Sequence, residues 1–352
     1  MTETLTIKDL QVDLKVIPLT TPFVTALHRV DSINAVRVRV ALSNGIVGTG
    51  TCTPNEKVTG DTINSAAAVI KEVIRPLLLG QDFGDWRRLL QLVQASIVHN
   101  GPAKAAVELA LYDAKRQLLG ISLTELLGGK GGSVHTDYTI SIGDPDQMIA
   151  EGQKRVEAGF KSLKLKLGHG HVDRDIKLVE DFAYAVGPMI HLRLDMNQAW
   201  SARETLAAAN YWKKHKLAID FIEQPVPAGD LDAMAWLTKT SPYPIMADEA
   251  VESYLDAQKV VEKRAADYIN IKLMKTGGLS EAQKINDLAE SRGIKTMVGC
   301  MIESIESISA ACSFVLANPN VVFADLDSVF MADQDPDMAN FAVAAGDTIT
   351  VK

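Results

Sequence analysis

The chain contains 352 residues, of which 47% are hydrophobic and 23% are charged, and its formal net charge is −8. This length can form one large domain or two of ordinary size, and the composition is typical of a globular protein. The acidic balance argues against nucleic acid as a partner, and no stretch approaches the ~18 uncharged apolar residues of a membrane span.

The cysteines and the first residues favour a cytoplasmic protein. Cys52, Cys300 and Cys312 have neither metal-ligand nor redox spacing, which suits a reducing compartment. The opening residues, MTETLTIKDL, are charged and strand-like, so they lack the basic-then-apolar layout of a signal peptide.

Residues 1–130 predict an α+β capping domain. Up to about residue 50 the chain is rich in strand formers, and Ser-Asn-Gly at 43–45 is typical of a hairpin turn. Apolar residues then recur at helical spacing in 63–79, 85–98 and 104–119. Strands followed by helices, without βα alternation, indicate an α+β arrangement.

Residues 131–330 alternate between strand-like and helical runs, which predicts a parallel barrel. Eight strand candidates follow one another, and eight is the number that closes a TIM-like barrel. We therefore expect an α/β fold, a (β/α)7β barrel, with residues 331–352 returning as a strand to complete the capping domain. The predicted strands end near Thr139, Lys166, Asp195, Glu223, Asp248, Lys272, Cys300 and Asp325.

Five charged residues stand at successive strand ends. Lys166, Asp195, Glu223, Asp248 and Lys272 follow one another at intervals of 24 to 29 residues, close to the length of a βαβ unit. Any one of them alone is better explained by a surface salt bridge, or by the solvated face of an edge strand. Five inward charges on adjacent strands are costly unless they pair or bind a metal. The set therefore favours an active site at the C-terminal end of the barrel.

The three acids predict a metal centre. Asp195, Glu223 and Asp248 belong to neighbouring strands, which lie ~5 Å apart, so their carboxylates can converge on one ion. Ligation by oxygen alone suits a hard divalent cation, with Mg²⁺ as the first candidate and Mn²⁺ as the second.

The two lysines predict proton transfer. Lys166 on strand 2 and Lys272 on strand 6 would face a substrate from opposite sides of the ring, so one could remove a proton from a carbon atom and the other return one. The alternation in Leu-Lys-Leu-Lys-Leu also points Lys164 inward, where its like charge is expected to favour the neutral form of its neighbour. A cation on the substrate carboxylate would stabilise the developing charge.

This pattern resembles the enolase superfamily, in its muconate lactonising enzyme-like subgroup, over nearly the whole chain. The strings LDMNQ, IEQPV, ADE and NIKLMKTGG carry the likeness. Within the subgroup the chain is most similar to dipeptide epimerases, because strand 8 ends in Asp325-Leu326-Asp327. The resemblance implies that Asp325 and Asp327 bind the ammonium group of a dipeptide substrate. A pair of solvated turn acids is the alternative.

By the same likeness, further residues contact the dipeptide. Thr139 and Lys164 would assist its carboxylate. Cys300, Met301 and Ile302 would line the peptide.

The second residue of the substrate is less well defined. The best-known members act on L-Ala-D/L-Glu and use a capping-domain arginine to bind the glutamate side chain. Here His28 stands at the matching position and Arg29 follows it, and an ordinary surface pair is the alternative. Members of this family are often oligomeric, so the resemblance also implies a homo-oligomer.

Other readings stay open. An epimerase of other dipeptides would share the whole site. An o-succinylbenzoate synthase or muconate cycloisomerase would use the same metal and lysines, but its substrate has no ammonium group for Asp325 and Asp327. Acid-sugar dehydratases and mandelate racemase-like enzymes are disfavoured because strand 7, IKTMVGCMIE, lacks a histidine. A barrel that only binds a metal or a peptide would not need both lysines.

Overall fold

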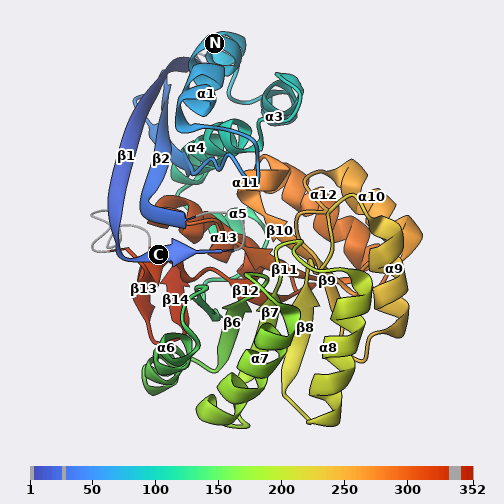
Figure 1. The fold of residues 1–352 in the computed structure, drawn as a ribbon. Helices are drawn as coiled ribbons and strands as arrows, with labels where there is room; N and C mark the ends of the chain where they lie inside the picture. The colour runs from blue at the N-terminus through green and yellow to red at the C-terminus, as the bar shows by residue number, and fades with distance from the viewer. Residues whose placement is uncertain (1–3, 26–28, 333–341, 352) are drawn as a thin grey trace.

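The computed structural model describes residues 4–25, 29–332 and 342–351 and shows a capping unit packed on a barrel (Figure 1). The capping unit has an antiparallel sheet of strand order β1-β2-β3, with helices packed against it. Its elements are β1 (Ile7–Val24), β2 (Arg29–Leu42), β3 (Val47–Cys52), α1 (Ile63–Ala68), η1 (Val69–Ile74), α2 (Arg75–Leu78), α3 (Trp86–Ala95), α4 (Gly101–Leu119) and α5 (Leu123–Leu126).

The close packing of α4 on β3 depends on two glycines. A Cβ atom at Gly48 would lie 2.1 Å from the Ala110 carbonyl oxygen, and one at Gly50 would lie 2.3 Å from that of Ala106. No larger side chain fits there, because real Cβ atoms do not approach backbone so closely. The small residues of both elements thus let α4 fill the space between the sheet and the barrel.

The second unit is a sheet of eight parallel strands, in the order β12-β11-β10-β9-β8-β7-β6-β5. It is nearly closed, since the Asp137 amide donates to the Ala324 carbonyl oxygen over 3.3 Å at the seam between β5 and β12. The strands are β5 (Tyr138–Ile140), β6 (Ser162–Lys166), β7 (His191–Asp195), β8 (Ile219–Glu223), β9 (Ile245–Ala247), β10 (Tyr268–Lys272), β11 (Lys295–Gly299) and β12 (Val321–Asp325).

Helices connect the successive strands and pack around them (Figure 1). This confirms the (β/α)7β barrel with an α+β cap. The connecting helices are α6 (Pro145–Glu157), α7 (Val172–Val186), α8 (Ala202–Lys214), α9 (Leu231–Thr240), α10 (Tyr254–Lys263), α11 (Leu273–Thr276), α12 (Leu279–Ser291) and α13 (Ile305–Ala317), and the 3-10 turn η2 (Asp327–Phe330) follows β12.

The predicted strand ends agree with the structure. Lys166, Asp195, Glu223 and Lys272 are each the last residue of a strand, and Asp248 directly follows one. The leucines that alternate with the lysines on β6 are fully buried. Side-chain alternation along each strand therefore turns the charged residues into the barrel and the leucines toward the helices.

The C-terminal tail differs from the expectation. Its hairpin, β13 (Ala342–Ala345) and β14 (Thr348–Val351), pairs with β4 (Ser133–His135) rather than with the β1-β2-β3 sheet. β4 directly precedes β5, the first strand of the barrel. Before the hairpin, Ala332 forms a single bridge with Leu19 of β1. Next to this bridge, the Thr20 amide and hydroxyl both donate to the Met331 carbonyl oxygen, so the described part of the chain after β12 also contacts β1. The buried Ile349 of β14 supports the pairing with β4.

Buried polar contacts join the cap to the barrel. Glu306 at the start of α13 forms ion pairs with Lys15 over 3.2 Å and with Arg37 over 2.5 Å. On the other side of the junction, Glu108 of α4 accepts a hydrogen bond from the Ser280 amide over 2.6 Å, at the first turn of α12. Both contacts fix the cap over the C-terminal ends of the strands.

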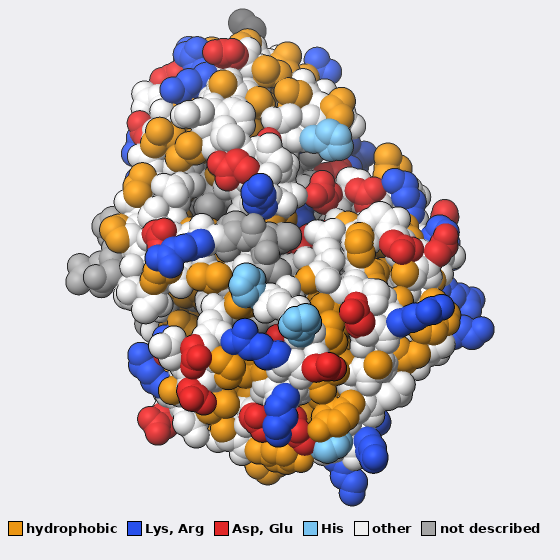
Figure 2. All heavy atoms as spheres, in the orientation of Figure 1, with side chains coloured by type: hydrophobic (Ala, Val, Ile, Leu, Met, Phe, Trp, Pro, Cys, Tyr) orange, Lys and Arg blue, Asp and Glu red, His pale blue; other side chains and the backbone are white. Residues whose placement is uncertain are grey.

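The outer surface carries no large region of one charge on the face shown in Figure 2, where acidic and basic side chains are interspersed. No helix in the described ranges is long and apolar enough to cross a membrane.

Candidate active site

A cavity of about 610 Å³ lies where the cap meets the C-terminal ends of the barrel strands. Residues of the capping unit such as Phe23 and Asn55 line one side, and Lys166, Asp248 and Asp327 line the other. Most of the predicted site residues therefore surround one space that is large enough for a small ligand, whereas Asp195 and Glu223 are not among the residues that line it.

The three acids converge as predicted. Oxygen atoms of Asp195, Glu223 and Asp248 lie within 4.8 Å of one another, and all three side chains are fully buried. Burial and the neighbouring carboxylates of Asp195 and Asp248 together raise the pKa of Glu223 to about 7, although the Lys164 ammonium opposes them. Burial also opposes ionisation of Asp195 and Asp248, but the lysines beside them outweigh it and hold both pKa values below the usual range.

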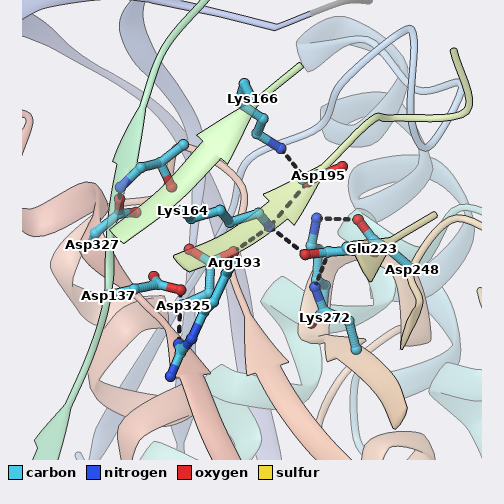
Figure 3. Close-up of polar contacts among 12 residues, drawn as sticks. Asp137, Lys164, Lys166, Arg193, Asp195, Glu223, Asp248, Lys272, Asp325 and Asp327 are labelled. Atoms are coloured by element: carbon cyan, nitrogen blue, oxygen red, sulfur yellow. Dashed lines mark hydrogen bonds and ion pairs between the residues drawn. The ribbon is translucent and has the colours of Figure 1, made fainter. Parts of the chain in front are cut away.

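Each of the two predicted bases is paired with a different member of this set (Figure 3). The Lys166 ammonium donates to Asp195 Oδ2 over 2.6 Å, and the Lys272 ammonium donates to Asp248 Oδ2 over 2.7 Å. The lysines are only 6% and 5% exposed. They belong to β6 and β10, which are separated by three strands on either path around the ring, so they approach the carboxylates from opposite sides.

The pKa of Lys272 differs from the expectation of a lysine close to neutrality. Burial lowers it, but the Asp248 carboxylate at hydrogen-bond distance outweighs burial and holds the pKa of Lys272 above its ordinary value.

Lys164 also has a different environment from the one expected. Its ammonium lies 3.0 Å from Asp195, 2.7 Å from Glu223 and 2.8 Å from Asp325 (Figure 3). Burial opposes its charge, but the three carboxylates outweigh it and raise the pKa of Lys164 well above its usual range. Its charge is therefore matched by the acids around it.

Asp325 and Asp327 are not solvated turn acids, because they are only 4% and 3% exposed and both line the cavity. Burial opposes ionisation of Asp325, but Lys164 lowers its pKa to about 2. Burial and the neighbouring Asp325 raise the pKa of Asp327 to about 7. The Thr139 amide donates to Asp327 Oδ2 over 2.5 Å, which fixes this carboxylate at the strand 1 side.

A buried pair that we did not predict supports these two aspartates. Asp137 lies within 4.8 Å of Asp325 and Asp327, and its Oδ2 accepts from Arg193 over 2.8 Å. Arg193 also donates to the Ala324 carbonyl oxygen and lies over the ring of Phe323, 4.7 Å from its centroid. The signal was present in the sequence, since Arg193 precedes Asp195 by two residues and must share its inward face.

Two further residues that hold metal-site carboxylates were also missed. Asn270 donates to Glu223 Oε1 over 2.8 Å, and Lys275 donates to Asp248 Oδ1 over 2.6 Å. Asn270 precedes Lys272 by two residues, so its inward direction follows from the alternation. Lys275 lies in the short helix α11 after that strand, where strand alternation gives no information.

Four other residues that were predicted to contact the substrate line the cavity. Cys300, Met301 and Ile302 follow β11 and line the cavity, as does Thr139.

Of the two capping-domain candidates, Arg29 lies among the described residues. Arg29 lines the rim of the cavity and pairs with Asp31 over 2.9 Å, with side chains 61% and 64% exposed. An exposed pair of this kind contributes little to stability. His28 lies outside the described residues.

The residues present fit a hard divalent cation. Glu223 Oε2 is buried and accepts no hydrogen bond from any described residue, although the Lys164 ammonium lies 2.7 Å away. Three convergent carboxylates with a free lone pair provide the oxygen ligands that Mg²⁺ prefers. Asp195, Glu223 and Asp248 would hold the ion.

Comparisons with known proteins agree with this geometry. Residues 147–351 match the family model of the enolase C-terminal domain-like proteins, and residues 9–128 match that of the mandelate racemase/muconate lactonizing enzyme N-terminal domain. The chain belongs to the enolase superfamily. The two matches confirm the family that the residues at the strand ends suggested.

Among curated relatives of this enolase-superfamily protein, the L-Ala-D/L-Glu epimerase of Bacillus subtilis is 40% identical, with 91% of this chain and 87% of the relative aligned. A solved substrate-liganded complex of the B. subtilis L-Ala-D/L-Glu epimerase superposes with a TM-score of 0.95 at 37% identity, covering 99% of this chain and 96% of that one. The dipeptide epimerase of Enterococcus faecalis, solved with Mg and L-Leu-L-Tyr, gives 0.93 at 32% identity, covering 99% and 97%.

Proposed function

We propose that the protein is a Mg²⁺-dependent dipeptide epimerase, an isomerase that inverts the α carbon of the C-terminal residue, with L-Ala-D/L-Glu as the first candidate substrate. The observation that carries this proposal is the pair of buried lysines on opposite sides of one carboxylate set. The relatives with this fold that act on dipeptides support it.

The two lysines perform the proton transfer. The neutral amine of one takes the α proton, and the electron pair of the broken C–H bond stays on carbon and spreads into the adjacent carboxylate. The ammonium of the opposite lysine then donates a proton to the other face of the same carbon, which inverts it. A bound divalent cation supplies Lewis-acid stabilisation of the negative charge on the carboxylate.

Residues of β5, β6, β12 and η2 would orient the dipeptide. Asp325 and Asp327 hold the α-ammonium group. Lys164 contacts both Asp325 and the metal ligands, Thr139 contacts Asp327, and both assist the substrate carboxylate. The ends of the substrate are thereby held at fixed places, so its α carbon stays between Lys166 and Lys272.

Further parts of the proposal follow from the family resemblance and the cysteines. The boundary between cap and barrel near residue 130, the use of Mn²⁺ in place of Mg²⁺ and a homo-oligomeric state extend the family resemblance. A cytoplasmic location is supported by the three free cysteines, of which Cys52 and Cys312 are buried.

The decisive experiment is a dipeptide library in D₂O with Mg²⁺, followed by NMR or mass spectrometry. We expect one deuteron at the α carbon of the C-terminal residue, together with interconversion of the two epimers. If no dipeptide exchanged its α proton and the protein instead turned over the o-succinylbenzoate precursor or muconate, the synthase or cycloisomerase function would replace the proposed one.

Replacement of Asp325 tests the ammonium subsite. Asp325→Asn should raise KM for dipeptides by about 10- to 100-fold, because a hydrogen bond to a charged group contributes ~1.5–3 kcal/mol. N-acetylated dipeptides carry no cation, so their turnover should change far less. Equal losses for both substrate types would show that Asp325 acts only through Lys164, which it contacts over 2.8 Å.

A further inference from the structure

Two buried polar atoms next to the metal-site acids have no hydrogen-bond partner among the described residues. They are Asn197 Oδ1 and Glu249 Oε2. The two residues are 6% and 8% exposed, and both line the active-site cavity. Leaving a buried acceptor unsatisfied costs ~1–3 kcal/mol. Two such atoms side by side therefore indicate a donor that enters the cavity with a ligand.

The two residues are held together and to the metal-site acids. Asn197 Nδ2 donates to Glu249 Oε1 over 3.2 Å, so the free oxygen of each side chain is left for a third group. The Asn197 amide donates to Asp195 Oδ1 over 2.9 Å, and Glu249 follows Asp248 directly. Asn197 adopts φ 40°, a left-handed conformation that is uncommon outside glycine and concentrates at functional sites.

Gln224 fixes the loop that carries Glu249. Its Oε1 accepts from the amides of Asp248 and Ala250, both over 3.0 Å, and its Nε2 donates to the Val226 carbonyl oxygen over 2.9 Å. The fully buried Gln224 thereby holds the backbone on both sides of Glu249. The position of the Glu249 carboxylate is therefore built into the fold before any ligand binds.

We propose that Asn197 and Glu249 form an outer-sphere pair that accepts hydrogen bonds from water bound to the metal ion. The inference rests on the metal site of the proposed function. Glu249 is not part of the set of acids whose oxygens converge within 4.8 Å, so it is placed beyond direct ligation. Mg²⁺ usually keeps several of its waters, and those waters are donors that need acceptors. Asn197 and Glu249 are thus positioning residues, which act on the ion through its water.

Calorimetric titration of the full-length protein with Mg²⁺, without substrate, tests the pair. Removal of outer-shell partners typically weakens metal binding about 10- to 100-fold. Glu249→Gln keeps one acceptor oxygen and should lose about tenfold, and Glu249→Leu keeps none and should lose about 100-fold. The matched control is Glu252→Gln, three residues further along the same loop and outside the cavity lining, which should bind Mg²⁺ like the wild type.

A second readout separates this role from a structural one. With Mn²⁺ as the probe, water-proton relaxation should show a shorter residence time of the metal-bound water in Glu249→Gln, at an unchanged melting temperature. Wild-type Mg²⁺ affinity in both Glu249 variants, with only KM for the dipeptide changed, would overturn the inference in favour of a direct substrate contact. Failure of the wild type itself to bind Mg²⁺ would instead refute the metal site of the proposed function.

Discussion

Lys166→Ala and Lys272→Ala should each abolish epimerisation, with kcat lowered by at least ~10²- to 10⁴-fold, the usual contribution of a positioned acid or base. Inversion needs a base on one face of the carbon and an acid on the other. The structure provides these two lysines on opposite sides of the carboxylate set, each 7% or less exposed in its side chain. Loss of either one leaves one face without a proton donor or acceptor.

The two variants should differ in the exchange that they retain. Each keeps the base on one face, so in D₂O it should exchange the α proton of one epimer only, and the two variants should favour opposite epimers. The measurement is deuterium incorporation into the L,L and L,D dipeptides incubated separately. Lys161→Ala, an exposed lysine just before β6, is the matched control and should behave like the wild type. Interconversion of both epimers at the wild-type rate by either variant would rule out two separate bases.

Lys164→Met should be the most destabilising single change in the site. Met keeps an unbranched apolar side chain, one atom shorter than that of lysine, but removes the charge that Asp195, Glu223 and Asp325 share within 3.0 Å. Removing one partner of a buried ion pair costs about 3–5 kcal/mol, since the remaining charges stay buried and uncompensated. Urea unfolding in the presence of EDTA should therefore show a loss of about 3–5 kcal/mol in the free energy of unfolding.

Saturating Mg²⁺ should restore part of this stability, because the cation binds the folded state and compensates the same carboxylates. The matched control is Lys177→Met, which removes an exposed lysine that is paired with two acids and should leave the unfolding curve unchanged. If Lys164→Met unfolds at the wild-type urea concentration with EDTA present, the carboxylates do not depend on Lys164 for their charge.

The barrel and its strand ends could be predicted because two local patterns agree. Alternation on each strand separates inward from outward residues, and the recurrence of strand, helix and loop fixes the interval between strand ends. Lys166 and Lys272 each end a strand, as predicted, and Asp248 directly follows one. Neither pattern depends on contacts between distant parts of the chain.

The contacts across the ring could not be predicted in this way. Lys164 meets Asp325, 161 positions further along the chain, only because the last strand closes beside the first. Closure also places Arg193 and Asp137 beneath the Asp325 carboxylate. The tail misled us for the same reason, since β14 has strand propensity but its partner is chosen by packing against β4. Local sequence reports propensity, and the partner depends on the assembled structure.

The placement of two separate lysines has a kinetic consequence. When one epimer is converted into the other, the lysine that took the proton leaves the reaction charged, and the lysine that gave one leaves it neutral. This is the form of the enzyme that accepts the product, so the forward reaction cannot repeat until both groups have exchanged protons with solvent. Because both side chains are almost entirely shielded from water, that reset can become slower than the chemistry at high substrate concentration. The enzyme would then cycle between two free forms, each committed to one direction of the reaction.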